Sequence, residues 1–300
     1  MRCGIGRRPL EDSQWWAAWV RNAMENDLMR LLARRSGLSK KFGLRYVDGR
    51  WPHLEIEHPA GVARLIGEAK KQVDLGRVFL RGQVEQHGAM LPGLFRANNA
   101  APDTLREAEK VLTDRIRHSI PVKRFDRADL PALLQHYGFR TSWLDAVDNL
   151  FVAAWFGANE LRTTTDSFIE ISPSSRKHGW LFLIATRSGP KQLRHVDLRI
   201  EHHPLSSRPH VQHGISLTTL DSTEYDLREF VVGTVRFPII GYTTTGALFE
   251  SSFLFPRLDD DHTLRLLVKH RVNDIAAEIE KQYKLADGSL GRVSRLRSAA

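Results

Sequence analysis

A strongly apolar segment follows directly on a polar turn within residues 135–157. Residues 149–156 are apolar on every side, which predicts a buried helix rather than an amphipathic surface helix. Asp148 precedes this segment and is the expected N-cap, because its carboxylate can accept hydrogen bonds from the free backbone N–H groups. The polar turn should therefore lie beside the start of the helix, where the helix dipole and unpaired donors favour anions.

The turn is rich in hydrogen-bonding groups. It contains Gln135, His136, Tyr137, Gly138, Thr141 and Asp145. Two interpretations stay open from this segment alone. In the first, the polar side chains form half of a ligand site. In the second, they only cap and brace the turn.

The N-terminal part has its own pattern. Apolar residues recur at helical spacing over residues 11–35, which predicts an amphipathic helix that carries three tryptophans. Residues 44–57 alternate around the pair Asp48-Gly49, and this pair suits a two-residue β-hairpin. Residues 1–58 are therefore expected to form an extension made of one helix and one hairpin.

The remaining pattern predicts an α+β domain over residues 59–285, with a mixed, mostly antiparallel sheet core flanked by helices. Helical spacing predicts helices over residues 59–72, 103–118, 130–137 and 262–285. Apolar or alternating runs predict strands over residues 78–80, 167–172, 180–186, 230–241 and 247–255. Residues 286–300 are rich in Gly, Ser and Arg, which predicts a mobile basic tail.

The charge of the chain is concentrated at its ends. Of the formal net charge of +9, residues 1–50 contribute +6 and residues 286–300 contribute +2. Nucleic-acid binding is therefore expected, if at all, through residues 1–50 rather than through the main domain. A solvated basic surface without a partner explains the same charge equally well.

Composition narrows the remaining classes. The single cysteine, Cys3, rules out intramolecular disulfides and multi-cysteine zinc sites. The sequence has neither a membrane-spanning apolar run nor a signal-peptide hydrophobic region, so a cytoplasmic protein without membrane contact is expected. The histidines between residues 202 and 213 match no paired-ligand spacing, and no metal is expected. Phosphate-binding Gly-rich loops and a G-x-S-x-G elbow are also absent from the sequence.

A second polar motif, Arg81-Gly82-Gln83, follows the apolar residues 78–80 at the predicted end of a strand. An arginine placed there, beside a glycine that permits close approach, can bind a phosphate or carboxylate bidentately. An internal salt bridge from Arg81 to an acidic residue is the equally weighted alternative.

The two motifs occur in an order that resembles the bacterial FRG domain, named for Phe-Arg-Gly. That family has a pattern of the form FRGQ followed by QHYGLPTRLLDWT-x-NPLVALYFA. The positions that agree are Arg81, Gly82, Gln83, Gln135, His136, Tyr137, Gly138, Thr141, Leu144, Asp145, Asn149, Ala153 and Phe156. A later Arg208, Gln212 and Gly214 resemble a distal element of the family, and the resemblance covers about residues 60–270.

The chain departs from this pattern mainly in the turn. Leu80 stands in place of the name-giving phenylalanine, Arg140 in place of the proline, and Ser142 in place of an arginine. Ala146-Val147 replaces the Trp-Thr pair. If the turn contacts a ligand, these changes predict an altered substrate or an altered activity.

The order of motifs is also similar to that of ADP-ribosyltransferases and related NAD-cleaving domains. This resemblance implies an NAD-consuming transferase or glycohydrolase of the toxin or phage-defence kind, with NAD as substrate. Arg81 would clamp the pyrophosphate with Gly82 and Gln83, and Gln135, His136 and Tyr137 would complete the binding site. Thr141 would contact the substrate, Gln212 would position it, and a carboxylate would stabilise positive charge during cleavage. The candidate carboxylates are Asp145, Glu224 and Glu229.

Two classes of function therefore remain. The first is an NAD-consuming enzyme whose target the sequence does not specify. The second is a module without catalytic activity that binds a ligand or a nucleic acid, and it is favoured by the altered turn and the basic ends.

Overall fold

The computed structural model describes residues 45–47, 52–96, 100–120, 129–164, 168–188, 190–202, 205–220, 225–239 and 250–296. The helix predicted over residues 11–35 lies outside this part of the chain, as does the turn pair Asp48-Gly49.

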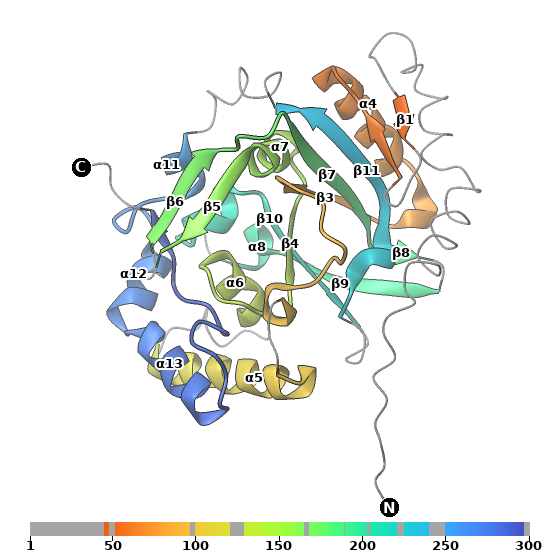
Figure 1. Cartoon of the computed structure of the whole chain (residues 1–300). Helices are drawn as coiled ribbons and strands as arrows, with labels where there is room; N and C mark the ends of the chain where they lie inside the picture. Colours follow the sequence, from red (N-terminus) through yellow and green to blue (C-terminus); the bar gives the residue numbers. More distant parts are fainter. Residues whose placement is uncertain are drawn as a thin grey trace, which may run out of the picture.

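A nine-stranded sheet forms the centre of the described structure (Figure 1), with the strand order β1-β2-β11-β7-β3-β4-β10-β9-β8. The strands are β1 (Arg45–Val47), β2 (His53–Glu55), β3 (Val78–Gln83), β4 (Leu144–Val147), β7 (His178–Ala185), β8 (Arg187–Ser188), β9 (Lys191–Asp197), β10 (Gly214–Thr219) and β11 (Val231–Pro238). All neighbours pair antiparallel except β2 with β11. The predicted mixed, mostly antiparallel sheet is therefore confirmed.

The central strand β7 buries both of its faces. Leu181 and Leu183 point into one core, and Phe182 and Ile184 point into another on the opposite face. Burying each such side chain contributes about 1.5–3 kcal/mol. Helices α4 (Pro59–Lys70) and α7 (Leu150–Ala158) cover the face of the sheet that carries Leu181 and Leu183.

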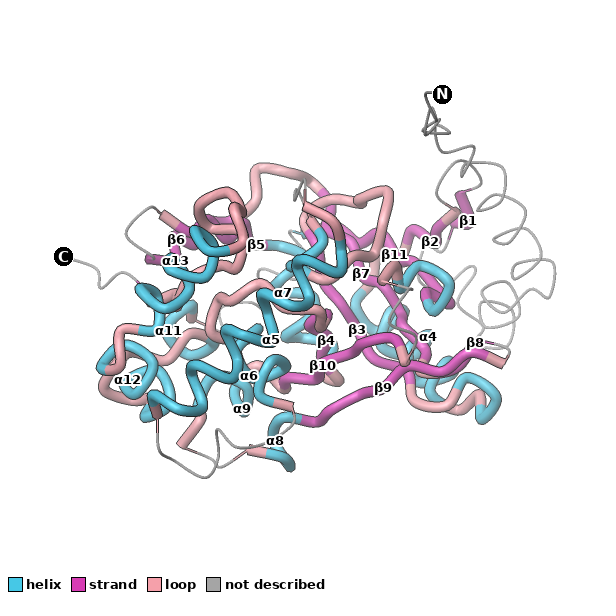
Figure 2. Tube along the Cα trace, turned by 90° about the horizontal axis from the view of Figure 1, so that it is seen from below, coloured by secondary structure: helices cyan, strands magenta, loops and turns pink. Residues whose placement is uncertain are grey.

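A separate helical layer packs beside the sheet and has its own apolar core. Its helices are α5 (Pro102–Ser119), α6 (Leu130–His136), α12 (His262–Lys269) and α13 (Val272–Gln282). Figure 2 shows these helices gathered at one end of the molecule, away from β1 and β2. The other described helices are short, namely η1 (Val73–Leu75), η2 (Gly93–Phe95), α8 (Leu198–Glu201), α9 (Ser207–Val211), η4 (Leu227–Phe230) and α11 (Ser251–Leu254). None of the described helices is long and apolar enough to cross a membrane.

A small second sheet follows α7 and joins distant parts of the chain. Strands β5 (Asn159–Thr163) and β6 (Phe168–Pro173) pair antiparallel, and β12 (Arg295–Leu296) adds to β6 in parallel. The mobile tail predicted over residues 286–300 is thus wrong for its described part. Leu290 and Val293 are 0% and 2% exposed, because they complete the core of the helical layer.

Two further local predictions need correction. The N-cap of α7 is Asn149, whose side chain accepts hydrogen bonds from the backbone N–H groups of Phe151 and Val152. Asp148 instead forms an ion pair with Arg199 at 2.8 Å, which takes its carboxylate away from the helix. The strand predicted over residues 247–255 is wrong in its described part, because Ser251–Leu254 forms the short helix α11.

The predicted hairpin is confirmed in its strands and wrong in its turn. Its strands exist as β1 and β2, but Val47 pairs with His53, and this register does not fit a two-residue turn at Asp48-Gly49. Strand β2 also pairs with β11, which attaches the hairpin to the main sheet. The remaining predicted elements agree with the described structure. The predicted helices over residues 59–72, 103–118 and 130–137 correspond to α4, α5 and α6, and α12 and α13 fall within residues 262–285.

Candidate functional site

The main sheet is split between β3 and β4. The two strands share one registered pair, Leu80 with Val147, and their ladder ends there. On either side of the split the pairing continues, because Arg81 pairs with Phe182 and Asp145 pairs with Ser216. The Arg81 side chain spans the split, and its Nη1 donates to the backbone carbonyl of Asp145. Arg81 and Asp145 belong to different polar motifs and are 64 residues apart in the sequence. They therefore meet where β3 and β4 separate.

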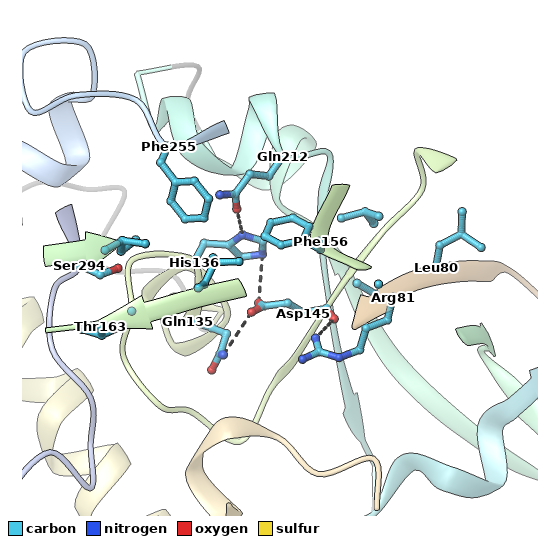
Figure 3. Close-up of a pocket in the computed structure, with 16 residues that line it drawn as sticks. Leu80, Arg81, Gln135, His136, Asp145, Phe156, Thr163, Gln212, Phe255 and Ser294 are labelled. Atoms are coloured by element: carbon cyan, nitrogen blue, oxygen red, sulfur yellow. Dashed lines mark hydrogen bonds and ion pairs between the residues drawn. The ribbon is translucent and has the colours of Figure 1, made fainter. Parts of the chain in front are cut away.

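A cavity of about 270 Å³ opens at this split (Figure 3). Its polar lining consists of Arg81, Gln135, His136, Asp145, Thr163, Gln212 and Ser294. Its apolar lining includes Leu80, Phe156, Leu161, Ile169 and Phe255. The small sheet thus supplies one wall and the main sheet supplies the opposite one.

Gly82 allows α7 to lie directly on β3. A Cβ atom at this position would lie 1.7 Å from the carbonyl oxygen of Ala153 and 2.7 Å from the backbone nitrogen of Gly157. Any side chain would therefore push α7 away from the sheet. Because Phe156 of α7 lines the cavity, Gly82 fixes the distance between the arginine strand and the apolar wall.

Asp145 is the one carboxylate among the described residues that line the cavity. Its Oδ2 accepts a hydrogen bond from Gln135 Nε2 at 3.2 Å, and its Oδ1 lies 3.3 Å from His136 Nε2. The Asp145 side chain keeps 35% of its surface exposed, whereas the His136 side chain keeps 3%. Asp145 is therefore the member of the pair that a ligand can contact, and His136 supports it from behind.

Each partner of Asp145 is itself held in one orientation. Gln135 Oε1 accepts hydrogen bonds from the backbone N–H and the hydroxyl of Thr141, at 3.0 and 2.9 Å, so its Nε2 must face Asp145. Gln212 Nε2 donates to the carbonyl of Leu254 at 2.8 Å, so its Oε1 faces His136 Nδ1 at 3.0 Å. Nδ1 of His136 therefore carries a proton that it donates to Gln212 Oε1. Such preorganisation fixes the carboxylate without help from the ligand.

Three of the residues proposed from the sequence lie outside the cavity lining. Tyr137 is 0% exposed, and its hydroxyl donates to Asp261 Oδ2 at 2.8 Å in the helical layer. Thr141 is buried behind Gln135 and acts on Asp145 only through that amide. Gln83 pairs with Trp180 at the end of β3. The other six are brought together in the lining: Arg81, Gly82, Gln135, His136, Asp145 and Gln212.

The surroundings of Arg81 disfavour the positive charge on its guanidinium. Burial lowers its pKa to about 9, with a further contribution from the charge on Arg96, while Asp145 acts in the opposite direction. The guanidinium stays charged at neutral pH, and its buried Nε has no hydrogen-bond partner among the described residues. An anion in the cavity would offset the cost of burying this charge.

A fully buried arginine, Arg208, fastens the back of the site. Its Nη1 donates to the carbonyl of His136 at 3.1 Å, and its Nη2 donates to the carbonyl of Ser294 at 2.8 Å. Its guanidinium also lies 5.1 Å from the centre of the Tyr137 ring and 5.3 Å from that of Phe255. Burial lowers the pKa of Arg208, and the neighbouring Tyr137 and Asp261 oppose this effect. Arg208 thus ties three walls of the cavity together.

Comparison with protein-family models matches residues 76–166 to the FRG domain. The chain contains an FRG domain. No curated protein and no solved structure matched the chain. The matched span runs from just before β3 to just after β5 and supplies Arg81, Gln135, His136 and Asp145. Gln212, Phe255 and Ser294 come from beyond it and complete the cavity.

One departure from the FRG pattern has a structural consequence. The backbone N–H of Arg140 donates to the carbonyl of Leu290 at 2.9 Å, and Phe139 forms a β-bridge with Gly291. The proline that the family pattern has at position 140 has no N–H to donate. Gly138, at φ +103°, permits the same approach, because a Cβ there would lie 2.4 Å from the carbonyl oxygen of Arg292. The turn of this FRG domain therefore docks the C-terminal segment.

Sequence reasoning missed the cavity residues that come from this segment and from the small sheet. Ser294, Thr163 and Ile169 carried no motif, and only the alternation around Ile169 gave any signal. Of the other candidate carboxylates, Glu229 pairs with Lys191 at 2.9 Å and is not part of the cavity lining. Glu224 lies outside the described residues.

The histidines near residues 202–213 have structural contacts in the described part of the chain. His202 lies 3.3 Å from Asp129, and His213 lies 3.0 Å from Asp148. His210 Nδ1 lies 2.9 Å from the carbonyl of Ser206. Among the described residues, no group of three or more His, Cys, Asp or Glu side chains is placed to hold a metal ion.

Proposed function

We propose that this FRG domain binds NAD in the cavity between β3 and β4 and cleaves its bond between nicotinamide and ribose. The observation that carries the proposal is the placement of Arg81 and Asp145 on opposite lips of one cavity, where the main sheet is split. Arg81 supplies a fixed cation for the diphosphate of the ligand, and Asp145 supplies an exposed carboxylate.

The chemistry requires a carboxylate at this position. As nicotinamide departs with the bonding electron pair, positive charge develops on the anomeric carbon of the ribose. The Asp145 carboxylate stabilises this charge, and the bond to Gln135 together with the contact to His136 keeps it in place. Water or a hydroxyl of a target molecule then forms the new bond to that carbon and loses a proton. The products are nicotinamide and either ADP-ribose or an ADP-ribosylated target.

The apolar wall suits the ring that leaves. Phe156 and Phe255 lie with ring centres 6.3 Å apart and planes at 79°. Their faces, together with Leu161 and Ile169, offer an apolar surface to a flat heteroaromatic ring. The same cavity thus pairs an anion contact with an aromatic contact, which are the two ends of a nicotinamide nucleotide.

Release of nicotinamide from NAD by the full chain tests this proposal. We expect turnover by the native chain, and a reduction of at least about 100-fold in Arg81→Ala, because a charge-assisted contact to the diphosphate is lost. Arg81→Lys should recover only part of the activity, since lysine keeps the charge but not the bidentate geometry. Arg64→Ala is the matched control, because Arg64 is exposed on α4 and is not part of the cavity lining.

Thermal melts of each variant separate loss of function from loss of fold. A folded Arg81→Ala variant that turns over NAD at the native rate would remove Arg81 from the site. If the native chain binds NAD but releases no nicotinamide, the protein is a ligand-binding module and not an enzyme.

A further inference from the structure

The ring of His136 is held between an amide and a carboxylate, and Figure 3 shows both contacts. Its Nδ1 lies 3.0 Å from Gln212 Oε1. The Gln212 amide cannot be turned round, because its Nε2 donates to the carbonyl of Leu254 at 2.8 Å. An amide oxygen only accepts hydrogen bonds, so Nδ1 carries a proton. The protonation state of the ring therefore depends on Nε2, which lies 3.3 Å from Asp145 Oδ1.

The contact between His136 Nε2 and Asp145 Oδ1 is enclosed. Both atoms are buried, and neither has a hydrogen-bond partner among the described residues. Gly214 packs on the same edge of the ring, because a Cβ there would lie 2.8 Å from His136 Cε1 and 3.1 Å from Nε2. In a neutral ring, two lone pairs would face each other across 3.3 Å, and both would be buried acceptors without a donor. A proton on Nε2 turns the same contact into an ion pair.

The surroundings favour placing this proton on the ring rather than on Asp145. An ordinary imidazole binds a proton more tightly than an ordinary aspartate by about two to three orders of magnitude. Asp145 Oδ2 also accepts a hydrogen bond from Gln135 Nε2 at 3.2 Å, which favours the ionised carboxylate. The positive charges of Arg81 and Arg96 interact with Asp145 in the same direction.

One positive charge opposes an imidazolium at His136. Arg208 approaches from the back of the site, where its Nη1 donates to the carbonyl of His136 at 3.1 Å. That contact is with the backbone, whereas Asp145 contacts the ring nitrogen itself. Because the Coulomb energy falls with distance, the attraction to Asp145 exceeds the repulsion from Arg208.

We infer that His136 is a positioning residue held as an imidazolium, and that Gln212 forces this state. Without the Gln212 oxygen, a neutral ring could carry its single proton on Nε2 and donate it to Asp145. The fixed amide binds that proton at Nδ1, so a second proton is required at Nε2. The His136 side chain keeps only 3% of its surface exposed, and it therefore acts on a ligand through Asp145.

This inference rests on the proposed function for what the imidazolium does. The diphosphate of NAD brings negative charge into the cavity, and that charge by itself favours protonation of Asp145. A fixed imidazolium offsets the effect and keeps the carboxylate ionised until the bond to nicotinamide breaks. His136 is then a buried counter-charge, and it neither gives nor takes a proton during the reaction.

Nitrogen NMR of the full chain, labelled with ¹⁵N in histidine and free of NAD, counts the protons on each ring. The measurement is made at about pH 7.5, where an ordinary histidine is mostly neutral. Both ring nitrogens of His136 should carry a proton in the native chain. Gln212→Met should leave one proton, on Nε2, and Asp145→Asn should leave one proton, on Nδ1, because each variant removes one of the two acceptors.

His210 is the internal control for these spectra. Its Nδ1 lies 2.9 Å from the carbonyl of Ser206, so it should keep its Nδ1 proton in the native chain and in both variants. A native His136 with a single ring proton would overturn the inference, and the native spectrum decides this even where a variant does not fold. Two ring protons retained in Gln212→Met would overturn the role of Gln212.

Kinetics supply a second readout. Gln212→Met should lower kcat for nicotinamide release by about three- to tenfold and leave KM for NAD within about twofold, since the lost charge acts on Asp145 and not on the diphosphate. An unchanged kcat would overturn the role of the imidazolium.

Failure of this inference is distinguishable from failure of the proposed function, because the NMR measurement needs no turnover. A doubly protonated His136 in a chain that releases no nicotinamide would keep the imidazolium and remove the enzyme. A singly protonated His136 in a chain that releases nicotinamide would keep the enzyme and remove the imidazolium.

Discussion

At the scale of single residues, Gly82 sets the geometry of the cavity more strictly than its charged neighbours do. Gly82→Ala should destabilise the fold by about 2–4 kcal/mol, because the new Cβ meets backbone atoms of α7 that have no freedom to move aside. Gly67 is the matched control, since nothing lies within 4 Å of a Cβ at that exposed helical position. Gly67→Ala should stabilise by about 0.5–1 kcal/mol. Urea unfolding measures both changes in stability. Equal unfolding midpoints for Gly82→Ala and Gly67→Ala would contradict the close packing of α7 on β3.

Single residues also show how much of the site can be predicted from the sequence. Arg81, Gln135, His136, Asp145 and Gln212 could be selected from their order along the chain, and they line one cavity. The inward direction of Tyr137 could not be anticipated. Successive residues at the end of a helix differ by about 100° in direction, so His136 and Tyr137 cannot both face the cavity. The buried Asp261 decides which of the two faces inward, because its carboxylate accepts a hydrogen bond from the Tyr137 hydroxyl. The two residues are 124 positions apart in the sequence.

At the scale of elements, α5 holds the site turn through one carboxyl group. Glu109 Oε1 accepts the backbone N–H of Ser142 at 2.8 Å. Burial raises the pKa of Glu109 from 4.5 to about 7, against the opposing effects of Ser142 and Arg106. The folded chain therefore binds more protons than the unfolded chain between about pH 4.5 and 7, and stability falls as the pH rises through that window.

Glu109→Gln tests this coupling, because the amide keeps an acceptor oxygen but does not ionise. Relative to this variant, the native chain should lose up to about 3 kcal/mol of unfolding free energy between pH 5 and 8. Denaturant unfolding at several pH values measures the difference. Exposed Glu107→Gln on the same helix should show no such divergence. Parallel pH profiles for the native chain and Glu109→Gln would show that Glu109 is not buried against the turn.

The sequence predicts a helix or strand correctly where its apolar spacing repeats over several turns. It fails where a distant partner in the fold decides the local structure. Helices α4 and α5 span three or more turns, so their apolar spacing is unambiguous. Strand β4 has four residues and places Asp145 between apolar neighbours, and it is a strand because β10 pairs with it across about seventy residues. The cap of α7 depended likewise on Arg199, which withdraws Asp148 from the helix.

At the scale of the whole molecule, the cavity is assembled by parts that the sequence assigned to different roles. The main sheet supplies Arg81 and Asp145, the small sheet supplies Thr163, and the C-terminal segment supplies Ser294. Composition alone marked that segment as a tail, because Gly, Ser and Arg outnumber its two buried apolar side chains. Its docking depends on distant groups, namely the N–H of Arg140 and the guanidinium of Arg208.

The central claim is that Asp145 acts on a ligand held by Arg81 in this cavity. The most direct measurement determines NAD binding by calorimetry and nicotinamide release by chromatography, in parallel, for the native chain and Asp145→Asn. We expect Asp145→Asn to bind NAD within about threefold of the native affinity and to release nicotinamide at least about 100-fold more slowly, because the lost charge matters only as the bond breaks. Asp114→Asn on α5, a half-exposed carboxylate paired with Arg117, should change neither quantity. Undiminished nicotinamide release by a folded Asp145→Asn chain would contradict the account.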